Sequence, residues 1–156
     1  MKPLSEKQLA YLAGFLDGDG SINAQLVERV DYRLKFQIRV SITFFQRTDK
    51  YWFLLQLKKE IGVGTCRKRK DGVSEYTIVG KQNVQLLLQQ LQPYLRLKQP
   101  QTTLVLEICQ NLAKKQEVDQ FLHLCGQVDK LQALNYSKTR KINSEAVRMV
   151  LKQDSP

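Results

Sequence analysis

The sequence predicts an α+β fold, with an αββαββα core in which helices back a curved, four-stranded antiparallel sheet, followed by C-terminal helices. Apolar residues recur at helical spacing near the N-terminus, alternate with polar residues in two pairs of later segments, and return to helical spacing in the last third. The length of 156 residues suits a single domain over residues 1–156. We expect the core to occupy about residues 5–98 and the C-terminal helical part about residues 99–152.

The first element is predicted to be a helix over residues 6–17, which Ser5 caps together with Gln8. One face of this helix is apolar, and a second strip consists of the small residues Ala10, Ala13 and Gly14. Glycine costs about 1 kcal/mol in a helix interior, so this strip predicts the close approach of another backbone.

An acidic, glycine-rich stretch, Asp17-Gly18-Asp19-Gly20, ends this helix. Acidic side chains at a helix C-terminus face the negative end of the helix dipole, which is unfavourable by roughly a few tenths of a kcal/mol unless a cation is present. Carboxylate and carbonyl oxygens together suit a hard divalent ion such as Mg²⁺. An ordinary turn that leads into a hairpin is the alternative interpretation.

Two strands follow, over residues 21–29 and 32–44, and we expect them to pair as a hairpin. Every even position of the second strand is apolar and every odd position is polar, and from Arg33 to Thr43 the polar side contains no acid. Polar and basic side chains of this kind read base edges and bind phosphates. A merely solvated strand face is the alternative. The candidate DNA-binding residues of this hairpin are Asn23, Gln25, Arg29, Arg33, Lys35, Gln37, Arg39 and Ser41.

A second helix is predicted over residues 48–61, with Thr48 as its N-cap and Gly62 directly after its end. Its expected apolar side consists of Trp52, Leu54, Leu55, Leu57 and Ile61. A second hairpin then joins residues 64–70 to residues 73–79 through Asp71-Gly72. Arg67 and Arg69 share one face of its first strand, where they suit contacts to guanine or, alternatively, to phosphate alone.

The remaining elements are helical. A third amphipathic helix runs through Val84 and Leu91 and stops at Pro93, and three more helices are expected in the last third, the final one capped by Asn143 or Ser144. The lone His123 among them is interpreted as structural. A basic loop lies before the last helix, and its Ser137, Lys138 and Lys141 are candidates for contact with phosphates.

The composition points to a polyanionic partner. The chain has 25 Lys and Arg against 15 Asp and Glu, a net charge of +10, which favours nucleic acid first and an acidic membrane second. No apolar run approaches the ~20 residues of a membrane span, and the N-terminus lacks the apolar region of a targeting peptide, so we expect no membrane partner.

The three cysteines, Cys66, Cys109 and Cys125, are expected to be reduced thiols. No Walker A, dinucleotide-binding or His-Glu-x-x-His motif is present, which leaves carboxylate-metal hydrolysis of phosphodiesters as the favoured chemistry, although a Ser-His-Asp triad remains open.

Residues 12–20, LAGFLDGDG, resemble the signature motif of the LAGLIDADG homing endonucleases, in particular the single-motif enzymes encoded in introns of algal organelles. Further stretches that fit this group are Trp52-Phe53-Leu54, residues 60–64, residues 90–93 and residues 137–141. The resemblance implies an intron-homing endonuclease that cuts double-stranded DNA across the minor groove and leaves short 3′ overhangs. It implies Mg²⁺ as cofactor, with Mn²⁺ as a substitute and no small-molecule cofactor, and an algal organelle, the chloroplast, as location.

The resemblance also implies roles for individual residues. Asp19 and the carbonyl of Gly18 would bind metal, whereas Asp17 would brace the helix end. Gln46 would order water around the nucleophile, and Lys50 and Lys98 would stabilise the developing phosphorane charge or activate water.

Because one chain carries one motif and a duplex has two strands, we expect a homodimer that packs through Ala10, Ala13 and Gly14 and reads a pseudo-palindromic site. A non-cleaving nucleic-acid binder, such as an RNA-splicing maturase, is the alternative. A plain basic structural or ribosome-associated protein would not explain the small-residue helix or its acidic end.

Overall fold

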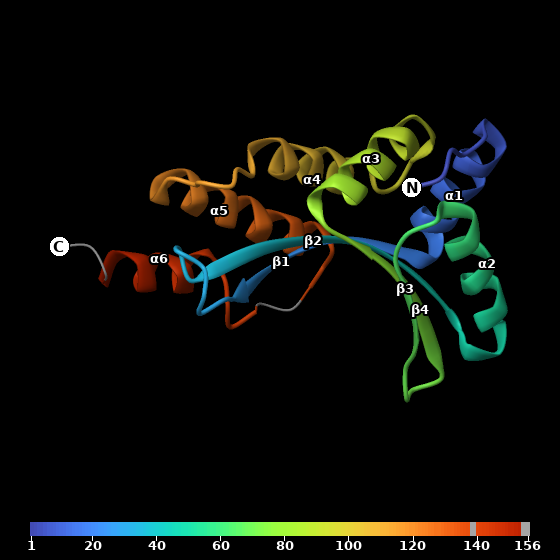
Figure 1. The fold of residues 1–156 in the computed structure, drawn as a ribbon, viewed down its shortest axis with the longest axis horizontal. Helices are drawn as coiled ribbons and strands as arrows, with labels where there is room; N and C mark the ends of the chain where they lie inside the picture. The colour runs from blue at the N-terminus through green and yellow to red at the C-terminus, as the bar shows by residue number, and fades with distance from the viewer. Residues whose placement is uncertain (138–139, 154–156) are drawn as a thin grey trace.

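The computed structural model describes residues 1–137 and 140–153 (Figure 1). Its elements confirm the predicted αββαββα core and the C-terminal helices. In chain order they are α1 (Glu6–Asp19), β1 (Gly20–Glu28), β2 (Phe36–Arg47), the 3-10 turn η1 (Thr48–Lys50), α2 (Tyr51–Ile61), β3 (Thr65–Lys68), β4 (Val73–Val79), α3 (Lys81–Leu91), the 3-10 turn η2 (Gln92–Tyr94), α4 (Gln99–Asn111), α5 (Val118–Leu134) and α6 (Ser144–Gln153).

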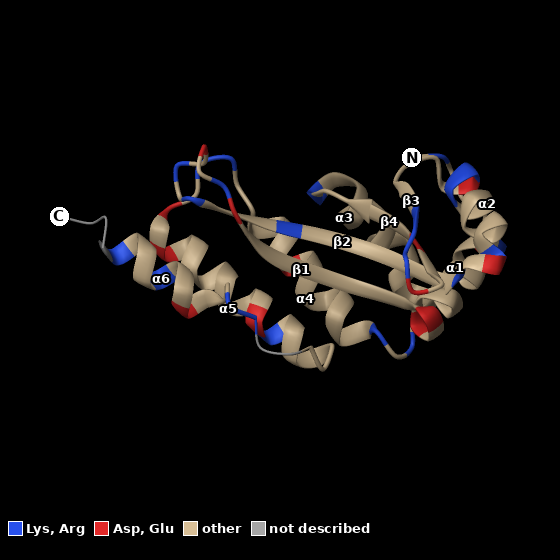
Figure 2. Ribbon diagram, turned by 90° about the horizontal axis from the view of Figure 1, so that it is seen from below, with Lys and Arg blue, Asp and Glu red and all other residues tan. Residues whose placement is uncertain are grey.

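The four strands form one antiparallel sheet in the order β1-β2-β4-β3. Figure 1 shows α1, α3, α4 and α5 along one side of this curved sheet. Figure 2 looks at the other side, where no helix lies in front of β1 and β2. The sheet therefore has one covered face and one open face.

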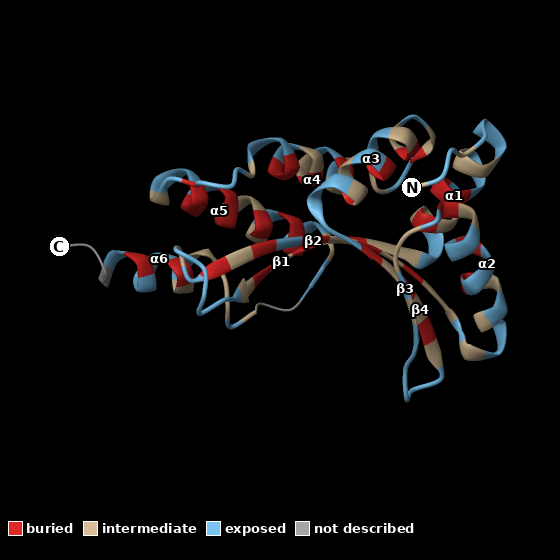
Figure 3. Cartoon of the chain, viewed as in Figure 1, coloured by how far each residue is buried: buried red, intermediate tan, exposed pale blue. Residues whose placement is uncertain are grey.

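The covered face of the sheet carries the hydrophobic core. The even residues of β2 from Phe36 to Phe44 are all buried, as the alternation predicts, and so are Ile22, Ala24 and Leu26 of β1 (Figure 3). Phe15 of α1 stacks on Phe44 with 5.7 Å between ring centroids, and Phe44 stacks on Tyr76 of β4 at 5.9 Å. This aromatic row fixes α1 on the sheet.

The start of α1 confirms the prediction, but its end does not. The Ser5 side chain accepts a hydrogen bond from the Gln8 amide, and the Gln8 side chain accepts one from the Ser5 amide, which is a capping box. The helix continues to Asp19, two residues beyond the predicted end, because Gly18 stays helical and the chain turns at Gly20 instead. A Cβ at Gly20 would lie 2.9 Å from the backbone of Leu16, so only glycine permits this abrupt passage from helix to strand.

The second predicted helix also differs in detail. Thr48 is not an N-cap, since its hydroxyl pairs with that of Ser74 at 2.9 Å and the residues around it form η1. Gly62 ends α2 in the left-handed conformation, as expected. Trp52 and Leu55, predicted on the apolar side, are 61% and 45% exposed. The apolar residues of α2 exceed what one face can bury.

The C-terminal helices follow the prediction closely. The Asn143 side chain caps α6 by accepting a hydrogen bond from the Ala146 amide at 2.9 Å. Pro100 lies in the first turn of α4, where its missing N–H is not needed. The Asn135 side chain donates to the Ile22 carbonyl at 2.8 Å and so ties the end of α5 to β1, an edge strand of the sheet. None of the described helices is long and apolar enough to cross a membrane.

Candidate active site and nucleic-acid interface

The C-terminal end of α1 presents an acidic side chain and a backbone carbonyl to solvent. Asp19 is exposed and makes no hydrogen bond or ion pair with any described residue. Gly18 lies in the last turn of the helix, where carbonyl groups lack a donor from the helix itself. The described residues include no group of three His, Cys, Asp or Glu side chains that could hold a metal ion. The donors present suit a hard cation that takes its other oxygens from elsewhere, as Mg²⁺ does with substrate phosphates.

Asp17 joins the end of α1 to the turn before α4. Its carboxylate accepts hydrogen bonds from the backbone amides of Arg96, Leu97 and Lys98 at 2.8, 3.2 and 3.0 Å. The ammonium group of Lys98 donates back to the Asp17 carbonyl at 2.8 Å. Asp17 therefore braces the helix end, as expected. It also holds the Lys98 ammonium group at a carbonyl that lies two residues before Asp19 in the last turn of α1.

Gln46 and Lys50 lie near the same end of α1. β1 begins directly after α1 and pairs with the part of β2 that leads to Gln46. Gln46 and Lys50 line one open pocket together with Tyr11 and Phe15 of α1. The fold thus gathers residues from α1, β2, η1 and the turn before α4, the four segments that supply the predicted catalytic side chains.

Most predicted DNA-binding residues of the first hairpin lie on the open face. The register places Gln25 opposite Arg39 and Asn23 opposite Ser41, and all alternate with buried residues. Figure 2 shows basic residues in the β1–β2 loop, in the middle of β2 and along β3. At the base of the loop, the Arg29 guanidinium donates to the Gln37 side chain at 3.0 Å.

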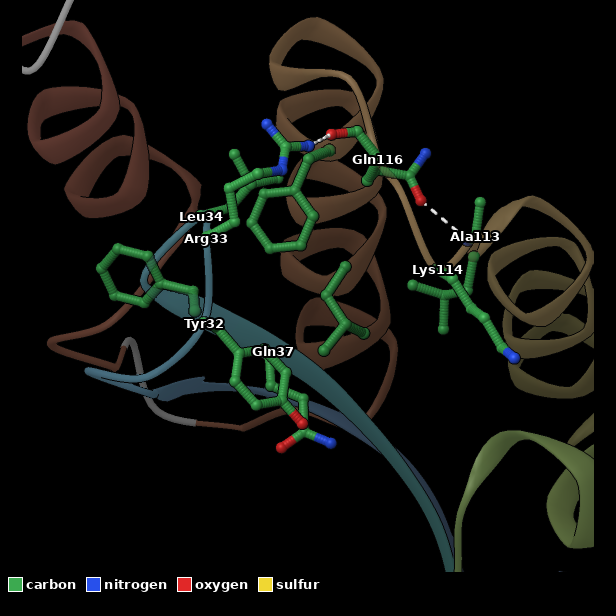
Figure 4. Close-up of a pocket in the computed structure, with 11 residues that line it drawn as sticks. Tyr32, Arg33, Leu34, Gln37, Ala113, Lys114 and Gln116 are labelled. Carbon is green, nitrogen blue, oxygen red and sulfur yellow. Dashed lines mark hydrogen bonds between the residues drawn. The ribbon is translucent and has the colours of Figure 1, made fainter.

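The prediction that Arg33 and Lys35 lie on a strand is wrong. The strand begins at Phe36 and not at Tyr32, and Lys35 has a φ of 65°, the left-handed conformation that a loop requires. The Arg33 guanidinium donates to the carbonyl of Gln116 in the α4–α5 connection (Figure 4). The prediction began the strand too early because Tyr32 and Leu34 alternate with basic residues just as the strand residues do. These residues instead form the loop that joins the two strands of the hairpin.

The second hairpin carries acids beside its predicted base-reading arginines. Arg67 forms an ion pair with Glu75 at 2.7 Å, and Arg69 forms one with Asp71 at 2.6 Å. β3 ends at Lys68, so Arg69 lies just beyond the strand. The register places Glu75 opposite Phe45, on the open face. The polar side of β2 contains no acid, as predicted, but the neighbouring strand adds Glu75 to the same open face.

The predicted dimer strip of α1 is only partly accessible. Ala10 and Gly14 are exposed, but Ala13 is fully buried in the chain's own core, so its assignment to an interface is wrong. Gly18 is exposed as well, and a Cβ at Gly14 or Gly18 would meet no atom within 4 Å. The accessible small residues are therefore Ala10, Gly14 and Gly18. Tyr11, beside them, is 57% exposed, and sequence reasoning missed it because it reads as part of an apolar helix.

In the basic loop, Ser137 and Lys141 are exposed. Lys138, the third predicted contact there, lies outside the described residues.

The cysteines are free thiols, as expected. Cys109 and Cys125 are buried, and burial raises the pKa of Cys109 to about 11 and that of Cys125 to about 12. Cys66 is half-buried and burial also raises its pKa. These thiols remain protonated at neutral pH and do not suit metal binding or nucleophilic attack.

The family model described as LAGLIDADG endonuclease matches residues 12–110. The DNA endonuclease I-CvuI of Chlorella vulgaris is 45% identical over 146 residues, which cover 94% of this chain and 91% of that protein. The DNA endonuclease I-CreI of Chlamydomonas reinhardtii is 48% identical over 144 residues, 92% of this chain and 88% of that protein.

Crystal structures of I-CvuI with DNA share the fold of this chain. One contains the target of I-CvuI in the presence of 2 mM Ca, with a TM-score of 0.89, 45% identity and 94% coverage of both chains. The other contains the I-CreI target, not cleaved in the presence of 2 mM Mg, with a TM-score of 0.89, 44% identity and coverage of 95% of this chain and 94% of that one.

Proposed function

The chain belongs to the LAGLIDADG endonuclease family, and on this basis we propose that it is a homing endonuclease that cuts both strands of a long, pseudo-palindromic DNA site as a homodimer. The observation that carries the proposal is the carboxylate of Asp19, which is exposed at the C-terminal end of α1 and has no partner among the described residues. A protein that only binds DNA gains nothing from an unpaired acid there, since phosphates repel it. A metal-dependent nuclease requires one.

In this proposal Asp19 and the Gly18 carbonyl hold a divalent ion, Mg²⁺ in the cell and Mn²⁺ as a substitute, together with phosphate oxygens of the DNA. The bound ion would polarise the scissile phosphate and lower the pKa of the attacking water. Because the described part of the chain offers no group of three acidic, histidine or cysteine ligands, the metal would take further oxygens from the DNA, and metal affinity and DNA binding would support each other.

The remaining residues act on the phosphate and on water. Gln46 hydrogen-bonds and orients the water near the nucleophile. Lys50 and Lys98 place positive charge where negative charge develops in the transition state. Lys98 is held for this role by its bond to the Asp17 carbonyl, whereas Lys50 lies exposed at the rim.

Two copies of α1 would meet through Ala10, Gly14 and Gly18, which are exposed and have room for a second backbone. Dimerisation would bring two Asp19 carboxylates to the dyad and extend two sheets over two half-sites. The relatives come from the green algae Chlorella vulgaris and Chlamydomonas reinhardtii, and we propose the chloroplast of such an alga as the location.

A comparison of the native protein with Asp19→Asn tests the function. Both are incubated with a pooled library of pseudo-palindromic duplexes, with and without Mg²⁺, and the cleaved ends and the bound duplexes are sequenced. We expect cleavage only by the native protein with Mg²⁺, at sites that both proteins bind. Asp119→Asn, which changes an exposed acid on α5, is the matched control and should cut normally.

Two outcomes would contradict the proposal. Cleavage by Asp19→Asn at the native rate would remove the acid from the mechanism. Binding without cleavage by the native protein would favour the non-cleaving binder, and an RNA partner such as a group of structured intron transcripts would then be the next probe.

A further inference from the structure

Tyr136, two residues after the end of α5, has the most exposed large side chain among the described hydrophobic residues, at 96%, and a φ of 54°. Its backbone completes a Schellman motif. The Tyr136 amide donates to the Ala133 carbonyl at 3.1 Å, and the Ser137 amide donates to the Gln132 carbonyl at 2.9 Å. This motif requires a left-handed residue, and the usual choices are glycine and asparagine.

The tyrosine ring contributes almost nothing to the fold. A bulky side chain in the left-handed conformation is strained, and a ring that remains exposed gains no burial to offset that strain. The phenol hydroxyl likewise makes no hydrogen bond with the part of the chain that is described. The ring is therefore available to a partner.

The position of Tyr136 indicates which partner. Its neighbour Asn135 is tied to Ile22 at the edge of β1, three residues after Asp19, a distance of about 10 Å along a strand. Figure 1 shows the chain after α5 passing to the side of the sheet that the helices leave open. The exposed residues that follow in this loop, Ser137 and Lys141, carry a hydroxyl and a positive charge. A duplex on the open face would bring its backbone to this edge within a few nucleotides of the Asp19 end.

We propose that Tyr136 is a DNA-backbone contact beside the cleavage site, with its hydroxyl donating to a phosphate oxygen and its ring lying on the adjacent deoxyribose. This inference rests on the proposed function for the orientation of the duplex. The bases of an intact duplex are stacked, so an aromatic ring at the edge of the sheet meets sugar and phosphate and not a base face. The contact is therefore independent of sequence, and it is uncharged.

The test compares native protein, Tyr136→Asn and Tyr136→Phe on two duplexes of equal length, one recovered from the pooled library and one scrambled. Affinity is measured by fluorescence anisotropy across a salt series. Asparagine keeps the left-handed backbone, so we expect Tyr136→Asn to raise the Tm by roughly 2–4 °C. It should nevertheless weaken binding to both duplexes by about three- to tenfold. Tyr136→Phe should lose only part of this affinity.

The salt dependence separates this contact from charge neutralisation. Tyr136→Asn should leave the slope of log K against log salt unchanged, because no phosphate charge is neutralised by a phenol. Leu86→Ala removes an exposed apolar side chain from α3, on the covered side of the sheet, and should bind like the native protein.

Native affinity of Tyr136→Asn for both duplexes would overturn the inference, and so would a fall in its Tm, since the ring would then support the fold. Failure of the proposed function is distinguishable. If the library yields no cleavage, the scrambled duplex still reports the backbone contact, which depends neither on sequence nor on cutting.

Discussion

At the scale of single residues, Asp17 makes four hydrogen bonds at the C-terminal end of α1. Its carboxylate accepts hydrogen bonds from the three backbone amides of residues 96–98, and its carbonyl accepts one from the Lys98 ammonium group. The sequence identifies Asp17 as a brace but not what it braces, because its partners lie about 80 residues away in the chain.

Asp17→Ala tests this brace. We expect the free energy of unfolding to fall by about 2 kcal/mol, since hydrogen bonds to a charged acceptor are lost. The corresponding fall in Tm is roughly 4–8 °C, measured by thermal denaturation. Cleavage should fall by roughly tenfold or more at 25 °C while DNA binding is retained, because the backbone of residues 96–98, which carries Lys98, loses its anchor to the Asp17 carboxylate. Asp17→Asn keeps one acceptor oxygen, so its Tm and its cleavage rate should lie between those of the native protein and of Asp17→Ala. Unchanged Tm and cleavage in Asp17→Ala would refute the brace.

At the scale of elements, α1 combines two surfaces that sequence periodicity does not separate. Ala13 belongs to the core, whereas Ala10, Gly14 and Gly18 face outward. The sequence-based strip contained residues of both kinds, because small residues fit equally well under a sheet and against another helix. Burial in the folded chain distinguishes them.

Gly14→Leu tests the outward surface of α1. A Cβ at this position would meet no atom within 4 Å, and leucine is a better helix former than glycine by about 1 kcal/mol. The single chain should therefore remain folded. We expect the bulky side chain to hold the two helices apart, giving a monomer in sedimentation velocity and no double-strand cleavage. Gly126→Leu in α5 also starts in open space and is the matched control. A native protein that is monomeric with and without DNA would contradict this prediction.

At the scale of the whole molecule, the net charge is +10, but the basic side chains are not equally free to bind DNA. Arg67 and Arg69 each pair with an acid, and Arg33 is engaged with the α4–α5 connection. Arg39, on the open face, is exposed and has no ion-pair partner among the described residues. A free arginine neutralises a phosphate directly, whereas a paired one must first release its acid.

Arg39→Ala should therefore flatten the salt dependence more than Arg69→Ala does. For Arg39→Ala we expect the slope of log K against log salt to decrease by about 0.9, the value for one phosphate contact. Arg69→Ala should change it by less, and Glu75→Gln should strengthen binding by removing repulsion of phosphates. Lys130→Ala on α5 changes an exposed charge away from the open face and should have no effect. Equal slopes for Arg39→Ala and the native protein would exclude a phosphate contact at Arg39, though not base readout.

By itself, the sequence determined the order and kind of the elements, the buried face of β2, the capping box of α1, the α2 end at Gly62 and the family motif. These features depend on neighbours within a few residues, where periodicity, capping and turn chemistry act directly. Only the tertiary structure decided that Ala13 is core, that Arg33 leaves the sheet, that Glu75 enters the open face and that Asp17 holds Lys98. Each depends on strand register or on contacts between distant segments, and a pattern within one segment does not specify which side chains another segment brings beside it.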